Sequence, residues 1–254
     1  MFQRLAGALL LAASLAAAAQ PAPPAATTSF AIYSQMAREV SLVRFQEATG
    51  SRLGNNLRER IPVQQGALDT VAVMAAGKVL RQSSPAAGLW LVGPTDEDLF
   101  DGLQNAAEGS KVEFPADMAA ALRERGSTHL LLFTRHRADA SFPIAYTSIG
   151  TGQIDGLGFY LDYQTELVRV GAGVASKGFL APFAYFRSTL VDVATQRILQ
   201  SQKSTVSGVT TSSDTKVSSI NPWNALTADQ KAAVLRQLVE REIARVVPLL
   251  VPKP

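Results

Sequence analysis

The sequence contains no cysteine among its 254 residues, and this absence removes several kinds of chemistry. Disulfides, thiolate metal sites and cysteine nucleophiles are excluded, and so is a lipid attached to an amino-terminal cysteine. Histidine is scarce as well, with two residues, so a zinc site would need carboxylates beside a lone imidazole. We therefore expect no metal and a fold that is stabilised by its core alone.

The motifs of the common catalytic classes are also missing. The chain has no G-x-S-x-G elbow, no G-x-x-x-x-G-K phosphate loop and no third glycine at the dinucleotide spacing after Gly150 and Gly152. The glycines between Gly150 and Gly178 are typical of turns in a sheet. We expect no cofactor and no enzyme activity.

Neither sign of charge dominates. The 24 Lys and Arg residues stand against 21 Asp and Glu, which gives a formal net charge of +3. Nucleic acids and anionic membranes are held by concentrated positive charge, so this balance argues against both as partners. Beyond the amino terminus, no run approaches the roughly 20 apolar residues of a transmembrane helix.

The first 19 residues have the layout of a secretory signal. Arg4 is their one charge, an apolar run follows from Leu5 to Ala18, and alanines precede a cleavage site that we place after Ala19. Residues 20–29 are rich in proline and alanine and predict a flexible leader. We expect an exported, periplasmic protein whose signal peptide is cleaved and which is not lipidated.

The remaining residues, 30–250, predict a single α/β domain. Its centre is a three-stranded antiparallel meander over residues 156–207, in which apolar and polar residues alternate from Leu157 to Leu167. This alternation predicts one buried face and one solvated face. The third strand, residues 197–206, is mostly polar and is placed at or near a sheet edge.

Periodicity and caps predict the other elements. Residues 30–46 favour a β-hairpin over the competing amphipathic helix, because β-branched and aromatic residues dominate them. Helices are expected at residues 67–82, 95–107, 115–125 and 227–247, the last ended by Pro248, and buried strands at 88–93 and 128–134. A mixed sheet covered by helices follows from this order.

Few side chains are candidates for a site. Arg135, His136 and Arg137 stand together at a strand end and could bind an anion, although a solvated strand end is the simpler interpretation. His129 is expected in or near the core, hydrogen-bonded to a neighbour. Acids at residues 96–101 suit the first turn of a helix better than a calcium site.

Paired carboxylates are the remaining route to catalysis. Asp155, Asp162 and Glu166 are the candidates, and Asp162 and Glu166 share one face of a strand. Glycosidases use two such acids, but solvated strand faces normally carry them too. A carboxylate-dependent glycan hydrolase is therefore kept as a second alternative function.

A turn motif gives the sequence a resemblance. Leu190 to Thr195 reads L-V-D-x-x-T, with Asp192 and Thr195 as its polar residues, and the order of elements around it resembles bacterial envelope proteins with an anticodon-binding-like α/β fold. These include the amino-terminal domain of the Tol-Pal translocation protein, the lipoprotein activator of penicillin-binding proteins and the curli secretion channel subunit. The resemblance implies that Asp192 caps a turn. Gln196 stands where those families have glycine, so a left-handed residue there would cost about 1 to 2 kcal/mol.

Two functions follow from the resemblance. The first is a non-catalytic periplasmic adaptor of the Gram-negative cell envelope that binds an envelope protein partner through an exposed sheet edge or the glycine-rich loops. The alternative is an outer-membrane secretion channel subunit that inserts a β-hairpin, since the strand beginning at Leu157 has the required length. Arg187 on the neighbouring strand disfavours that alternative.

Overall fold

The computed structural model describes residues 28–47, 56–63, 66–93, 103, 109–168, 175–211 and 221–251, which form one α/β domain around a large mixed sheet. The predicted fold class is thereby confirmed. The sheet strands are β1 (Ser29–Ser34), β2 (Glu39–Arg44), β3 (Leu57–Pro62), β4 (Gly88–Leu91), β5 (His129–Arg135), β6 (Arg137–Asp139), β9 (Gln153–Val168), β10 (Ala175–Asp192) and β11 (Ile198–Ser207). A separate hairpin consists of β7 (Phe142–Ile144) and β8 (Thr147–Ile149). The helices are α1 (Ala67–Ser83), α2 (Ala116–Glu124) and α3 (Ala228–Leu250), with a 3-10 turn, η4, at Pro222–Ala225.

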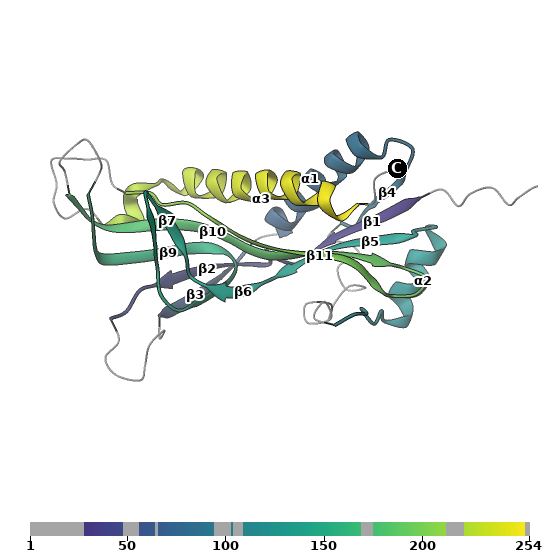
Figure 1. Ribbon diagram of the computed structural model, residues 1–254, viewed down its shortest axis with the longest axis horizontal. Coiled ribbons are helices and arrows are strands. Elements are labelled where there is room, and N and C mark those ends of the chain that lie inside the picture. Colours follow the sequence, from purple (N-terminus) through teal and green to yellow (C-terminus); the bar gives the residue numbers. More distant parts are fainter. Residues whose placement is uncertain are drawn as a thin grey trace, which may run out of the picture.

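The 18-residue strand β10 organises the sheet. Its first part pairs with β9 and its second part with β5, while β11 lies along its other side. β9 and β5 therefore follow one another end to end along β10, and Figure 1 shows the elongated, twisted sheet that results. The predicted meander β9-β10-β11 is present, with β11 at an edge.

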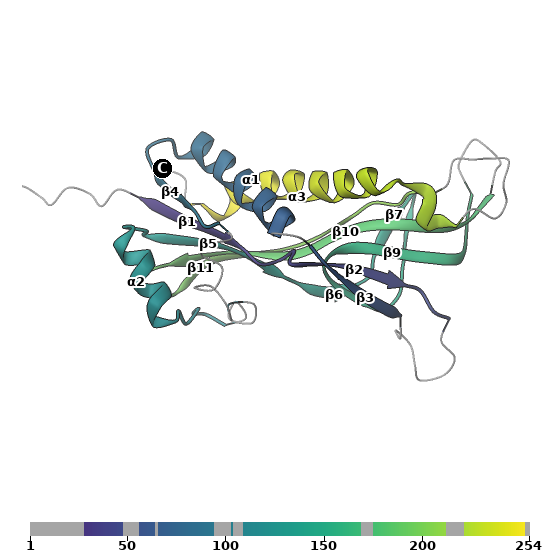
Figure 2. The same ribbon diagram turned by 180° about the vertical axis from the view of Figure 1, so that it is seen from behind.

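The prediction of a hairpin at residues 30–46 is wrong. Both expected strands exist, but β1 pairs in parallel with β4 and β5, whereas β2 pairs with β3 and β9. The chain continues in nearly the same direction from β1 to β2 and does not reverse (Figure 2). The four residues between them hold no glycine, proline or asparagine that would favour a tight reversal.

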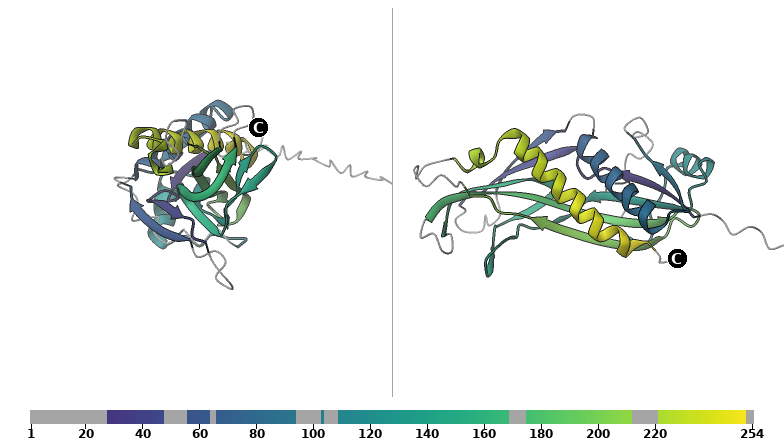
Figure 3. Two further views of the ribbon diagram at one scale, coloured as in Figure 1. Left: turned by 90° about the vertical axis from the view of Figure 1, so that its left-hand side faces the viewer. Right: turned by 90° about the horizontal axis from the view of Figure 1, so that it is seen from above.

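Helices cover both faces of the sheet. α1 and α3 lie on one face and α2 on the other (Figures 1 and 3). On the first face, α1 and α3 pack on β1, β5 and β10 through the apolar cluster that contains Ile32, Phe133 and Leu238. On the second face, Met118 and Leu122 of α2 pack on the opposite side chains of the same strands. Gly126 closes α2 with a φ of 63°, a left-handed backbone that glycine adopts without strain.

Both faces of β9 are buried along its first half, and the predicted solvated face is wrong there. Leu157 and Phe159 face α3 and its surroundings, while Tyr160 on the other face has no exposed surface. The β7-β8 hairpin covers Tyr160, with the Phe142 ring centroid 4.7 Å from the tyrosine ring. The sequence gives no periodic signal for two strands of three residues, so this cover was not predicted.

The ends of the long helices differ in detail from the predictions. α1 buries Ala72, Ala76 and Leu80, and Asp69 lies in the same buried stripe. α3 passes through Pro248 and ends at Leu250, whereas the proline was expected to stop it. A proline in the last turn removes one backbone hydrogen bond of the helix. The burial of Leu250 in the core offsets this loss and favours the extra turn.

Several predictions fall outside the described residues. The signal peptide at 1–19, nearly all of the leader at 20–29 and the helix expected at 95–107, with its acidic residues, belong there. Ser29, assigned to the leader, is the first residue of β1, and its backbone N–H donates to Thr128 Oγ1 at 2.9 Å.

Candidate functional site

The motif at Leu190 to Thr195 forms the turn between β10 and β11. The Thr195 N–H and hydroxyl both donate to Asp192 Oδ1, at 2.7 and 2.5 Å. Gln196 has a φ of 58°, so it occupies the left-handed position at which the resembling families have glycine. The bond from the Thr195 hydroxyl, with that from its N–H, lowers the pKa of Asp192. Both polar residues of the motif hold the turn together.

The three residues of the candidate anion patch lie where β5 ends and β6 begins. Arg135 donates to Glu39 Oε2 at 3.4 Å, on the face that carries Phe133. His136 lies between β5 and β6 and is half-buried. Arg137 begins β6 and is exposed.

The candidate carboxylates have structural partners. Asp155 forms an ion pair with Arg58, which ties β9 to β3. Asp162 is 4% exposed and accepts bonds from the N–H groups of Gln164 and Thr165 and from the Thr165 hydroxyl. Glu166 is exposed, and the register is irregular between the two acids, since an advance of four residues along β9 from Asp162 to Glu166 matches an advance of two along β10. The Asp162 carboxylate is thus engaged within its own strand.

His129 is half-buried at the start of β5. Its Nδ1 lies 2.8 Å from the hydroxyl of Thr128, and burial lowers the pKa of its imidazole, with a smaller opposing effect from Asp192. Within the residues described, no group of three His, Asp or Glu side chains is arranged to hold a metal ion. None of the described helices combines the length and apolar character needed to cross a membrane.

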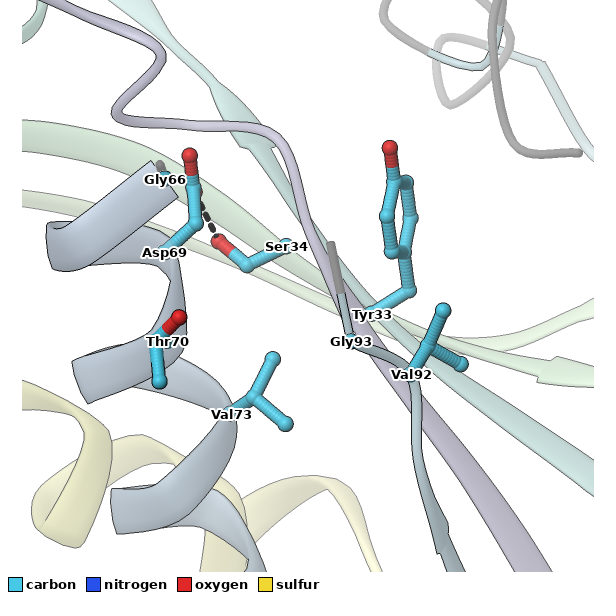
Figure 4. Close-up of a pocket in the computed structure, with 8 residues that line it drawn as sticks. All are labelled: Tyr33, Ser34, Gly66, Asp69, Thr70, Val73, Val92 and Gly93. Atoms are coloured by element: carbon cyan, nitrogen blue, oxygen red, sulfur yellow. Dashed lines mark hydrogen bonds between the residues drawn. The ribbon is translucent and has the colours of Figure 1, made fainter. Parts of the chain in front are cut away.

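A small hollow lies where α1 begins, beside the ends of β1 and β4 (Figure 4). Its volume is about 10 Å³, room for one water molecule, whereas small-molecule sites measure about 300 to 1,000 Å³. Asp69 lies beside it, 4% exposed, and accepts bonds from Ser34 Oγ at 2.5 Å and from the Ala37 N–H at 3.1 Å. The carboxylate therefore fastens α1 to the segment between β1 and β2.

The free edge of β11 is the best candidate for a binding site. In the described part of the chain β11 pairs with β10 alone, and only its beginning is covered, where the Ile198 N–H donates to Ser110 O at 2.9 Å. The Gly208 N–H donates toward β10, to Pro182 O at 3.0 Å. Backbone groups alternate in direction along a strand, so those of Ser201, Lys203 and Thr205 point away from the sheet. This row of donors and acceptors can pair with another strand.

Two cations lie beside this edge. Arg187 of β10 pairs directly with Lys203 of β11, and on its other side with Thr134 of β5. Because the backbone groups of Lys203 point away from β10, Arg187 and Lys203 form a non-hydrogen-bonded pair. In such a pair the Cα atoms are about 4.5 Å apart and the side chains come closest. Both side chains lie on the face away from α3, since Phe186 and Ser204 take the α3 face. The next pair on this face, Thr189 and Ser201, has its hydroxyls 3.4 Å apart.

β3 and β4 end the sheet at its other edges. Each charged residue of β3 forms an ion pair with β2 or β9: Arg58 with Asp155, Glu59 with Arg44 and Arg60 with Glu39. On β4, the Arg125 guanidinium lies 4.4 Å from the centroid of Trp90. Sequence reasoning placed β11 at an edge but missed the Arg187–Lys203 pair, because that pair depends on the strand register and on the extra residue at the beginning of β11.

Comparisons with known proteins do not assign a family. No family model matches the chain, and no curated protein matches it. Among solved structures, a neuraminyllactose-binding hemagglutinin homolog from Helicobacter pylori is 8% identical, with a TM-score of 0.43 over 92% of this chain and 94% of that chain. A PelC dodecamer from Paraburkholderia phytofirmans is 11% identical, with a TM-score of 0.30 over 92% and 96%. A hypothetical protein from Chlamydia trachomatis is 10% identical, with a TM-score of 0.34 over 88% and 98%. Similarity of this degree carries no information about function.

Proposed function

We propose that the protein is a non-catalytic adaptor of the Gram-negative cell envelope, exported to the periplasm, that binds an envelope protein by adding a partner strand to β11. The observation that carries the proposal is the free edge from Ser201 to Thr205, whose backbone groups point away from the sheet. Main-chain hydrogen bonds to such an edge supply affinity, and the side chains beside them supply specificity.

The chemistry of the other candidate groups supports binding rather than catalysis. Asp155 and Asp162 are committed to an ion pair and to a turn, and Asp192 is committed to the β10-β11 connection. The β9-β10 hairpin, which the alternative function would insert into a membrane, has both faces covered along its central residues, with Leu157, Tyr160 and Phe183 all buried. Its side chains are core residues of this domain.

The role of the edge is tested with one substitution and a matched control. Thr205→Pro removes a backbone N–H that points away from the sheet, and proline is tolerated at such edge positions. Thr205→Val keeps the N–H and the shape of the side chain. Both proteins are expected to fold, with similar melting temperatures. Crosslinking in envelope fractions should capture the same component with wild type and Thr205→Val, and should fail with Thr205→Pro. Equal capture by all three would exclude β11 as the binding site.

Export is a separate part of the proposal, supported by the charged start, apolar middle and alanine-rich end of residues 1–19. Amino-terminal sequencing of the protein from a periplasmic fraction should begin at Gln20. A chain that starts at Met1, or that remains with the cytoplasmic fraction, would contradict export without bearing on the edge.

A further inference from the structure

We infer that the protein bound at β11 also takes the ring of Tyr146 into an uncharged, apolar pocket on its own surface. Tyr146 lies at the tip of the β7-β8 hairpin and its side chain is fully exposed, whereas Tyr163, another exposed aromatic residue, keeps 42% of its surface. This inference rests on the proposed function, because it adds a second contact to the same interface.

Neutral residues surround the ring on both sides in the sequence. Residues 140–154 contain no charged side chain, although 18% of the whole chain is charged. Charged residues are the ordinary occupants of an exposed surface. The core of a protein interface, in contrast, is depleted of charged residues and enriched in tyrosine. The composition of the hairpin is therefore typical of a contact surface for a protein.

The body of the domain holds the hairpin at its base. Phe142 has no exposed surface and packs among the aromatic residues of β9 and β10. The Ser141 N–H donates to the Tyr185 hydroxyl at 3.1 Å, and the Thr151 N–H donates to the Tyr160 hydroxyl at 3.2 Å. Because these contacts fix the base before a partner arrives, binding at the tip costs little further conformational entropy.

The turn at the tip is strained. Ala145 is the first of its two residues and has a φ of 36°, a position at which two-residue hairpin turns favour glycine. Alanine has fewer accessible backbone conformations than glycine, so the turn orients Tyr146 more narrowly. Strained positions of this kind concentrate at functional sites.

The hairpin and the edge of β11 belong to one surface. The hydroxyl of Ser207, at the end of β11, donates to Ser141 O at the hairpin base, at 3.1 Å. Thr205 lies opposite Tyr185, so its side chain is on the face that the hairpin covers. A protein that adds a strand to β11 and extends over this face therefore reaches Tyr146.

A lipid surface fits the tip less well. Residues 140–154 contain no lysine or arginine that would attract anionic headgroups. A complete myristoyl chain gives only marginal, reversible membrane binding, and one tyrosine ring buries much less apolar surface. In a protein pocket that excludes water, a single tyrosine is enough to act as a hot spot. The size of the apolar contact therefore favours a protein as the occupant.

The test places the photoreactive residue p-benzoylphenylalanine at position 146 or at position 203 of the full-length protein in envelope fractions. Lys203 is an exposed residue of the β11 edge. Both probes should crosslink to the same protein, and Thr205→Pro should remove both crosslinks. Leu249 is the control position, because it is 61% exposed on α3, on the face opposite the hairpin. A probe there should not reach that protein.

The probe at position 203 then measures what the ring contributes to binding. Tyr146→Phe keeps the ring and should retain the crosslink, whereas Tyr146→Ser should weaken binding about thirtyfold in a titration of crosslink yield. Thr147→Lys should also weaken binding, because it carries a charge into the apolar contact. Tyr163→Ser is the matched control and should leave the yield unchanged. All of these positions are exposed, so unchanged melting temperatures are expected.

Each result decides between the claims. An unchanged yield with Tyr146→Ser, or crosslinks from positions 146 and 203 to two different proteins, would reject the inference and retain the β11 edge. Crosslinking of position 146 to phospholipid, or to a second copy of the chain, would overturn the proposed pocket in favour of that occupant. Absence of any protein crosslink from position 203 would reject the proposed function, and the inference with it.

Discussion

Asp69 is a carboxylate that lies inside the apolar stripe of α1, with 4% of its surface exposed. It is the acceptor for Ser34 Oγ and for the Ala37 N–H, two donors that have little access to water. An acid in a first helical turn is ordinarily assigned to the helix dipole, so the sequence gives no reason to place this one in the core.

Asp69→Ala should lower the free energy of unfolding by about 2 to 4 kcal/mol, because two buried donors lose their partner. Urea denaturation gives this value directly. Asp117→Ala is the control, since Asp117 also lies in the first turn of a helix but is exposed, and it should change stability by less than about 0.5 kcal/mol. Equal effects of the two substitutions would show that Asp69 acts only through the helix dipole.

Gln196 is a residue whose strain the sequence does predict. Its φ of 58° is costly for a side chain with a Cβ, so Gln196→Gly should stabilise the protein by about 0.5 to 1 kcal/mol after the extra entropy lost by glycine is subtracted. Thermal melts should show a higher midpoint. Gln200→Gly, at an extended position of β11, should show a lower one. A lower midpoint for Gln196→Gly would mean that the glutamine side chain stabilises the turn.

Asp192 gives the turn a dependence on pH. Its pKa is lowered in the folded state, chiefly by the Thr195 hydroxyl, so the turn contributes stability above the unfolded pKa of about 3.9 and loses it as the pH falls through the folded value. Thr195→Val removes the hydroxyl bond and keeps the N–H bond. NMR titration should then find a higher Asp192 pKa than in the wild type. An unchanged pKa would assign the shift to another group.

Among the elements, those with long and regular patterns are the ones that the sequence predicts. α1, α3 and β9 have many residues in phase, and their ranges agree with expectation to within a few residues at most ends. β10 begins at Ala175, inside the stretch whose glycines predict a turn. Pairing is less predictable. The β-branched and aromatic residues of 30–46 predict two strands but not their partners, and β4, β5 and β9, with which β1 and β2 pair, come much later in the sequence.

The candidate site depends on the same long-range pairing. Arg187 and Lys203 lie on different strands, and an extra residue in the register near Leu190 determines which side chains face each other. The polar composition of residues 197–206 predicts that β11 lies at an edge of the sheet. The same composition does not predict that Lys203 faces Arg187.

α3 is the element whose packing can be tested most simply. Leu235 is 3% exposed and packs with Phe159 and Leu180 on the sheet. Leu235→Asp would bury an unpaired charge and should cost several kcal/mol, enough to unfold most of the protein at 37 °C. Circular dichroism follows the loss of structure. Arg236→Asp, one residue away on the exposed side, should leave the melting curve nearly unchanged, and a similar loss in both variants would contradict the assigned faces.

At the scale of the whole molecule, β10 and α3 connect two differently packed ends. At one end the sheet lies between α1 and α2, while at the other the β7-β8 hairpin and the beginning of α3 cover β9 and β10 (Figure 3). Since β10 pairs with β9 at one end and with β5 at the other, separating the ends would break one continuous strand. The domain should therefore unfold as one cooperative unit.

The two tryptophans report the two ends separately. Trp90 lies on β4 beside α2, and Trp223 packs against Phe159 at the far end, with ring centroids 5.8 Å apart. Trp223→Phe and Trp90→Phe each leave a single fluorophore, and urea curves of the two variants should agree in midpoint with circular dichroism. Adding Phe183→Ala, a cavity at the Trp223 end costing about 3 to 5 kcal/mol, should shift the Trp90 signal as far as the Trp223 signal. A change in midpoint seen by Trp223 but not by Trp90 would show that the two ends unfold separately. The continuous strand β10 would then not be enough to make unfolding cooperative.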